Sequence, residues 1–215
     1  MPPQLPGSAA PGPGRPLATY ASVAHFARVY DYLLGGKDNF AADREAAEQA
    51  MRINPDIVST ARANRAFLVR TTSYLARQAG LRQFLDIGTG MPTNRNIHEV
   101  AQSIAPRSRV VYVDHDPIVL THARALLTSA PEGVTDYLEA DLREPGKILA
   151  DAARTLDFSR PVAIMLIAVL HLILDRDDPY DLIEPGLVRI SEWHPASVSD
   201  LAVRAQMWGA IGRKP

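Results

Sequence analysis

The sequence predicts an α/β fold in which a mainly parallel sheet carries helices on both faces. Three features of one stretch predict it: an apolar run over 83–87 that ends in two glycines, a helix pattern that begins at Asn96, and a β-branched run over 110–113 that ends in an aspartate. Short apolar runs of β-branched residues are typical of buried parallel strands. A strand, a glycine turn, a helix and a strand with a terminal acid together predict the nucleotide-binding half of a Rossmann-like fold.

Each part of this stretch has its own signal. Glycine is favoured where the backbone needs a positive φ or where a Cβ would block a ligand, and this explains Gly88 and Gly90. Asn96 followed by Glu99 has the spacing of a capping box, and the apolar residues after it repeat at helical spacing until a proline. At the end of the second strand, the Asp114 carboxylate can accept hydrogen bonds from ribose hydroxyls.

The chain before this stretch predicts a tail and three helices. Residues 1–17 are rich in proline and glycine and are expected to form a disordered tail. Ser22 is expected to cap a helix that Gly35 ends. Two further helices are expected over 43–52 and 56–80. The polar connection after the first helix indicates, from its residues alone, a solvated turn rather than a lid.

The rest of the chain continues the alternation of strands and helices. Asp116 precedes a proline and is expected to cap a helix. A strand over 134–140 delivers Asp141 at its carboxyl end, a short helix follows through 147–153, and a fourth strand with its exit covers 161–171. The carboxyl ends of these strands are expected to converge, which is where open α/β sheets bind ligands.

Composition narrows the classes of function. The 215 residues can form one core of ordinary size, and the net charge of −1 gives no electrostatic reason to expect nucleic acid or a membrane as partner. Cysteine is absent, which excludes disulfides and thiolate metal sites, and the histidines lack the spacing of metal ligands. The longest apolar run, 161–174, is too short to span a bilayer, and the N-terminus lacks the pattern of a secretion signal. These features predict a cytoplasmic protein without a bound metal.

Details of the glycine turn decide between nucleotides. A dinucleotide site needs a small residue three positions after the second glycine, but Thr93 occupies that position behind Pro92. The loop up to Asn96 is also too long for a pyrophosphate held directly on the helix N-terminus. An acid in the strand, here Asp86, followed by Gly-x-Gly is instead the pattern of S-adenosylmethionine (SAM) methyltransferases.

Residues 84–127, together with Tyr-Asp-Tyr-Leu-Leu-Gly-Gly-Lys-Asp-Asn-Phe at 30–40, resemble a bacterial family of SAM-dependent methyltransferases that was first catalogued as a domain of unknown function. The resemblance covers most of 18–179 and resumes at Glu184. It implies a Rossmann-like class I methyltransferase sheet with an N-terminal helical lid. Because it includes residues 30–40, it favours the lid over the solvated turn there.

The resemblance implies a single domain over 18–215. That domain comprises a helical lid (18–80), a SAM-binding half (81–174) and a terminal β-hairpin (184–215). Compared with the family, a block is missing after Asp181, and one further parallel strand is expected to be absent. The last strands must then pair with the fourth strand or leave an edge exposed.

The resemblance also implies the residues that hold the cofactor. The two glycines leave room for the methionine portion, and Asp114 binds the ribose hydroxyls. Asp141 binds the adenine amino group, and Leu142 packs on the adenine ring. From its sequence position alone, Asp141 could instead cap the following helix. Arg65 could bind the methionine carboxylate, but a place on a solvated helix face is an equal alternative. The full set of cofactor candidates is Asp86, Gly88, Thr89, Gly90, Asp114, His115, Asp141, Leu142 and Arg65.

The catalytic residue is open. His171 at a strand end, Tyr32 and Asp38 are candidates for a general base, although a histidine at such a position is more often structural. The resemblance implies a small-molecule methyl acceptor and allows a homodimer. Two alternative functions stay open, a shortened SAM-binding protein without catalytic activity and, with less support, an NAD-dependent oxidoreductase.

Overall fold

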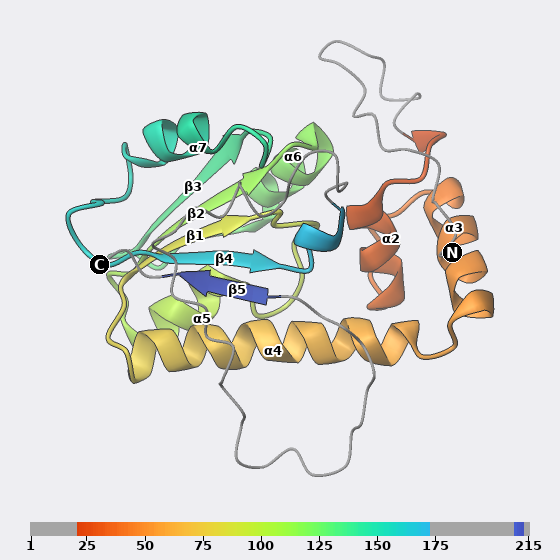
Figure 1. Cartoon of the computed structure of the whole chain (residues 1–215), viewed down its shortest axis with the longest axis horizontal. Helices are drawn as coiled ribbons and strands as arrows, with labels where there is room; N and C mark the ends of the chain where they lie inside the picture. The colour runs from red at the N-terminus through yellow and green to blue at the C-terminus, as the bar shows by residue number, and fades with distance from the viewer. Residues whose placement is uncertain (1–20, 173–208, 213–215) are drawn as a thin grey trace. The chain divides into compact units, whose positions relative to one another are not determined.

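The computed structural model describes residues 21–172 and 209–212, which fall into two compact units that divide after Arg62 (Figure 1). The N-terminal unit contains the helices α2 (Phe26–Leu33) and α3 (Ala41–Ile53). Helix α4 (Ile57–Arg77) begins in this unit and continues into the second, which contains the sheet. No helix in the described ranges is long and apolar enough to cross a membrane.

The N-terminal unit has a small core of its own. Val29 and Leu33 of α2 pack with Ala47 of α3 and Ala61 of α4. A buried carboxylate, that of Asp43, completes the first turn of α3 by accepting the Phe40 backbone N–H at 2.8 Å. Helix α3 therefore begins two residues earlier than its sequence pattern predicts.

The start of α2 also differs from the prediction. His25 occupies the N-cap, and Ser22 lies in a turn before the helix. The His25 backbone N–H donates to Asp43 Oδ1 at 2.8 Å, and Arg28 Nη2 donates to the Val23 carbonyl at 2.7 Å. These contacts from later in the chain hold the segment before the helix extended, so the prediction that Ser22 caps it is wrong.

The second unit is built on a sheet of strand order β3-β2-β1-β4-β5. The first four strands are parallel and β5 is antiparallel to β4. Their bounds are β1 (Gln83–Ile87), β2 (Arg109–Asp114), β3 (Val134–Glu139), β4 (Ala163–Ile167) and β5 (Gly209–Gly212). The order reverses between β1 and β4, and such a switch point is where open α/β sheets bind ligands.

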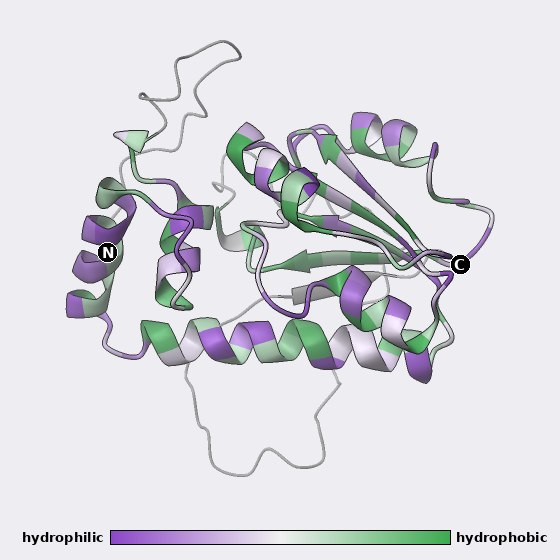
Figure 2. Ribbon diagram, turned by 180° about the vertical axis from the view of Figure 1, so that it is seen from behind, coloured by the Kyte–Doolittle hydropathy of each residue, from purple (hydrophilic) through white to green (hydrophobic). Residues whose placement is uncertain are grey.

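Helices cover both faces of this sheet, as predicted (Figure 1). Helix α4 and helix α5 (Ile97–Ile104) pack on one face, through a cluster that includes Phe84, Val110 and Tyr112. Helix α7 (Pro145–Ala152) packs on the other, against Leu85 and Val111. Helix α6 (Pro117–Leu126) connects β2 to β3. The central strands carry mostly hydrophobic residues (Figure 2).

The end of the sheet confirms one expectation about the shortened chain. The predicted terminal β-hairpin (184–215) contains β5, whose Ile211 pairs with Met165 of β4. Within the described residues the sheet passes directly from β4 to this antiparallel strand, so the last strand pairs with the fourth, which is one of the two expected outcomes. The first part of this predicted hairpin, up to residue 208, lies outside the described residues, as does the predicted tail over 1–17.

Candidate functional site

The two glycines after β1 have different roles. Both have positive φ, +77° at Gly88 and +68° at Gly90. A Cβ at Gly88 would lie 2.5 Å from a methyl group of Val169, so this glycine is needed for packing against the turn after β4. A Cβ at Gly90 would meet no heavy atom within 4 Å. The space beside Gly90 is therefore open to a ligand.

Asp114 connects this glycine turn to the end of β2. Its Oδ2 accepts the Gly90 backbone N–H at 2.9 Å, and its Oδ1 accepts the Asp116 backbone N–H at 3.0 Å. Each carboxylate oxygen can accept a second hydrogen bond, so both retain capacity for a hydroxyl donor. Asp116 in turn caps α6 by accepting the Ile118 N–H at 2.8 Å, which confirms the predicted helix start.

Asp86, on β1, is a second buried acid near the glycine turn. Its side chain is 6 % exposed, and its Oδ2 accepts one hydrogen bond, from the Thr89 hydroxyl at 2.9 Å. Burial raises the pKa of Asp86 to about 7, the Thr89 hydrogen bond and the Arg65 charge act to lower it, and the Asp114 charge raises it further. A nearby cation would stabilise the ionised form of this buried carboxyl.

Arg65, on α4, holds the loop that follows the glycines. Its Nη2 donates to the Asn96 side chain at 3.0 Å and to the Asn94 carbonyl at 3.2 Å. Arg62 and Arg70 on the same helix are exposed, whereas Arg65 is half-buried. The hydrogen bonds of Arg65 and its partial burial argue against the alternative of a solvated helix face, and its charge acts to lower the pKa of Asp86.

The N-terminus of α5 is already bonded within the protein. The Asn96 N–H donates to Glu99 Oε2 at 2.6 Å, which confirms the predicted capping box. The His98 N–H donates to the Tyr112 hydroxyl at 2.9 Å, and His98 Nδ1 lies 2.8 Å from the same oxygen. This contact was not predicted, because it joins two buried residues that no local motif connects.

A tight turn follows β3. Asp141 Oδ1 accepts the backbone N–H and the Nε of Arg143, both at 2.9 Å, and Oδ2 accepts Arg143 Nη2 at 2.5 Å. These hydrogen bonds hold the pKa of Asp141 below its usual range. Helix α7 begins later, with Glu144 at its N-cap, so the alternative that Asp141 caps this helix is wrong. Leu142 packs partly against the core on that face of the sheet.

His115 directly follows Asp114 at the end of β2 and interacts electrostatically with both acids. Its side chain is 43 % exposed, and its Nδ1 is 3.7 Å from Asp114 Oδ1. Its charge also contributes to the low pKa of Asp141. The structure therefore brings together Asp114, His115 and Asp141 at the carboxyl ends of β2 and β3.

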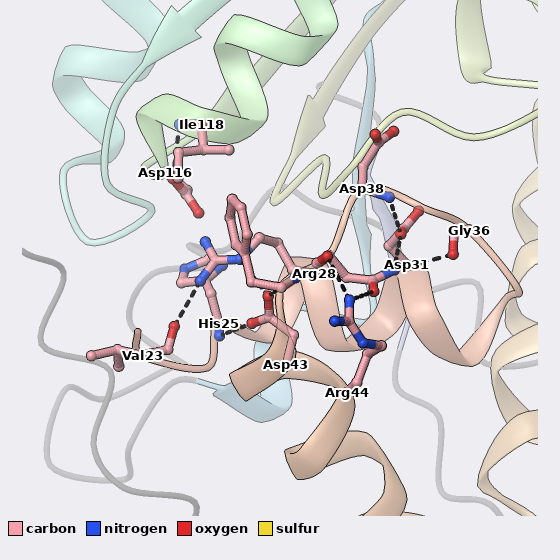
Figure 3. A network of polar contacts seen from close by, with 12 residues as sticks. Val23, His25, Arg28, Asp31, Gly36, Asp38, Asp43, Arg44, Asp116 and Ile118 are labelled. Atoms are coloured by element: carbon pink, nitrogen blue, oxygen red, sulfur yellow. Dashed lines mark hydrogen bonds and ion pairs between the residues drawn. The ribbon is translucent and has the colours of Figure 1, made fainter. Parts of the chain in front are cut away.

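The candidates for a general base come from the 3₁₀ turn after β4 and from the N-terminal unit. The backbone of His171 lies in the short 3₁₀ turn η1 (Leu170–Leu172), and its side chain is outside what the structure describes. Tyr32 and Asp38 belong to the N-terminal unit. There the Asp31 carboxylate accepts the Asp38 N–H at 3.0 Å and the Asn39 amide at 2.9 Å (Figure 3). The connection over 35–40 is therefore ordered around a buried acid. In the described part of the chain, no cluster of three or more ligating side chains could hold a metal ion.

Comparisons with known proteins agree with this architecture. The chain is similar to a DUF574 family protein from Streptomyces avermitilis, at 39 % identity over 91 % of this chain and 99 % of that one, with a TM-score of 0.80. It is also similar to a candidate methyltransferase from Thermobifida fusca, at 33 % identity over 94 % and 99 % of the two chains, with a TM-score of 0.69. No protein of curated function matches. The model of the S-adenosyl methyltransferase family matches residues 16–183. The chain therefore belongs to this family of SAM-dependent methyltransferases, which the sequence motifs predicted.

Proposed function

We propose that the carboxyl ends of β1, β2 and β3 bind SAM, and that this methyltransferase transfers the methyl group to a small-molecule acceptor. The observation that carries the proposal is the open space beside Gly90, next to an Asp114 carboxylate that retains acceptor capacity. Asp86, on the strand that leads into this turn, and Arg65, whose charge acts on Asp86, add a carboxyl group and a cation. Together they match a ligand with an amino-acid end and a ribose.

The order of the candidate residues supports an extended ligand. Asp86 is on β1, Asp114 ends β2, and Asp141 follows β3, so the three acids come from consecutive neighbours in the sheet. Adjacent strands are about 4.8 Å apart, and three strands therefore span roughly 10 Å. Methionine, ribose and adenine are joined in this order in SAM. We assign Asp86 and Arg65 to the amino-acid end, Asp114 to the ribose, and Asp141, Leu142 and His115 to adenine.

The chemistry requires mainly positioning. SAM supplies a methyl group on a sulfonium, and an acceptor lone pair displaces it in line as the C–S bond breaks and its electrons return to sulfur. An acceptor that carries a proton also needs a base. His171, Tyr32 and Asp38 stay candidates for that base. Gly88 and Thr89 contribute by shaping the turn and by holding Asp86.

Two observations bear on the alternatives. A dinucleotide pyrophosphate binds at free N–H groups of a helix N-terminus, but in α5 the His98 N–H already donates to Tyr112. This occupied N–H argues against an NAD-dependent oxidoreductase.

In the described residues β4 pairs directly with the antiparallel β5, as expected for a shortened chain, and this supports the second candidate, a SAM-binding protein without turnover.

Isothermal titration calorimetry of the full chain with SAM, S-adenosylhomocysteine (SAH) and NAD tests the proposal. We expect SAH binding that Asp114→Ala weakens by about 10- to 100-fold, because charged hydrogen bonds to the ribose are lost. Asp157→Ala is the matched control, since this aspartate is 54 % exposed and lies beside Gln83, at the opposite end of β1. A folded chain that binds NAD but neither SAM nor SAH would overturn the proposal.

Turnover then separates the two SAM-binding functions. Incubation of the protein with SAM and fractions of bacterial small molecules should produce SAH in at least one fraction. Asp114→Ala should lose this product in step with its loss of binding. Tight SAH binding without product in any fraction would favour the SAM-binding protein without turnover.

A further inference from the structure

The turn after β3 holds one carboxylate unusually firmly for a residue near the surface. Arg143 donates three hydrogen bonds to Asp141, one from its backbone and two from its guanidinium, at 2.9, 2.9 and 2.5 Å. The Glu144 N–H also donates to the Asp141 carbonyl at 2.9 Å, which closes the turn. We call this arrangement, of Asp141 and Arg143, the Asp–Arg clamp.

The clamp leaves one acceptor site on the carboxylate. Two oxygens offer about four lone-pair positions. Among the described residues, two donors reach Oδ1 and one donor reaches Oδ2. Oδ2 therefore retains a single acceptor position, whose direction is fixed because the guanidinium fixes the plane of the carboxylate. The lowered pKa of Asp141 keeps the group ionised, so that it only accepts hydrogen bonds.

Stability does not account for the clamp. The side chains of Arg143 and Asp141 are 55 % and 28 % exposed. Surface ion pairs of this kind contribute little to folding. Asp151 on α7 and Arg154, which follows the helix, form a comparable exposed ion pair. The clamp differs from that pair in its place, because it stands directly after β3 and beside His115.

We propose that Arg143 is a positioning residue for recognition of the adenine base. By fixing Asp141, it leaves one oriented acceptor for the exocyclic amino group of adenine and none that suits a base with a carbonyl at that position. This inference rests on the proposed function, because it presumes that adenine lies at the end of β3. Arg143 was not among the residues that the sequence predicted, although Asp-x-Arg after a strand was the available signal.

The test compares SAH with its deaminated analogue, S-inosylhomocysteine, in which a carbonyl replaces the amino group. Dissociation constants of both ligands are measured by calorimetry for the wild type, Arg143→Ala, Arg143→Lys and the control Arg154→Ala. We expect the wild type and the control to prefer SAH by about 30-fold or more, because a site built to accept a hydrogen bond is left with an unpaired group by the analogue. Arg143→Ala should reduce this preference to within about threefold by weakening SAH alone.

Arg143→Lys should give an intermediate preference, since an ammonium keeps the charge but cannot form the two-point contact. An equal loss of affinity for both ligands in Arg143→Ala would mean that Arg143 only supports the turn, and would overturn the inference while the SAM site stands. Equal binding of the two ligands by the wild type would also overturn it. A wild type that binds neither ligand would refute the proposed function, and the inference with it.

Discussion

Two buried aspartates, one in each unit, differ in how their charge is satisfied. Asp43 is fully buried and accepts hydrogen bonds from the His25 N–H at 2.8 Å, the Phe40 N–H at 2.8 Å and Arg28 Nε at 2.9 Å (Figure 3). Asp86 is also buried but accepts a side-chain hydrogen bond only from Thr89 among the described residues. A carboxylate with a full set of donors supports the fold, whereas one that burial leaves short of donors is suited to receive a ligand.

The largest expected effect concerns Asp43. Asp43→Ala leaves the Arg28 guanidinium, 2 % exposed, without its carboxylate. Removing one partner of a buried ion pair costs about 3–5 kcal/mol of unfolding free energy, up to the local stability of the N-terminal unit. Urea unfolding followed by circular dichroism measures this. Glu45→Ala, at an exposed acid on the same helix, is the control and should change stability by less than about 0.5 kcal/mol. A small effect of Asp43→Ala would remove the contrast between the two aspartates.

The Asp43 carboxylate stabilises the folded protein, whereas ionisation of Asp86 should destabilise it at high pH. The pKa of Asp86 is raised from 3.8 to about 7 in the folded protein, so between pH 4 and pH 7 the unfolded chain ionises while the folded protein stays protonated. The folded state therefore loses stability as the pH rises through this window. Asp86→Asn removes the loss, and its stability relative to the wild type should rise by roughly 3 kcal/mol from pH 5 to pH 8. Urea unfolding at both pH values measures it, and parallel wild-type and mutant stabilities would contradict it.

The contrast explains which parts of the molecule the sequence could predict. The strands and α5 follow from local signals, since β-branched runs and the pair Asn96 and Glu99 act over a few residues. The start of α2 was predicted incorrectly because Asp43, from later in the chain, determines it. A tertiary contact of this kind leaves no periodic pattern.

The candidate site was predictable in its residue types but not in its energetics. The acids at the ends of β1, β2 and β3 could be named because strand ends and glycine turns are visible in the sequence. The near-neutral pKa of Asp86 depends mainly on how completely the folded chain buries this carboxyl, which no motif encodes. The separate roles of Gly88 and Gly90 depend likewise on Val169, a residue from another strand end.

Ligand affinity should follow the ionisation of Asp86. If the ammonium of the amino-acid end pairs with the ionised acid, SAH binding in the wild type should strengthen about tenfold from pH 6 to pH 8, since the ionised fraction rises through the pKa near 7. Asp86→Asn should bind weakly and with little dependence on pH. Asp114→Ala should also bind weakly but keep a dependence on pH, with its midpoint moved to lower pH because the Asp114 charge that raises the pKa of Asp86 is lost. Calorimetry at the two pH values measures all three, and a wild type with constant affinity would show that Asp86 does not contact the cation.

The smallest effect should come from loss of the Thr89 hydroxyl, which donates a hydrogen bond to Asp86. The Thr89 hydroxyl donates to Asp86 Oδ2 and acts to lower its pKa, so Thr89→Val should raise that pKa further. The midpoint of SAH binding against pH should then move upward, while the affinity at high pH stays near that of the wild type. Thr89→Ser, which keeps a hydroxyl, should leave the midpoint in place. A midpoint that moves equally in both variants would mean that the turn itself, and not the hydrogen bond, controls Asp86. An upward shift in Thr89→Val alone would show that the number of donors around this carboxylate sets its readiness for a ligand.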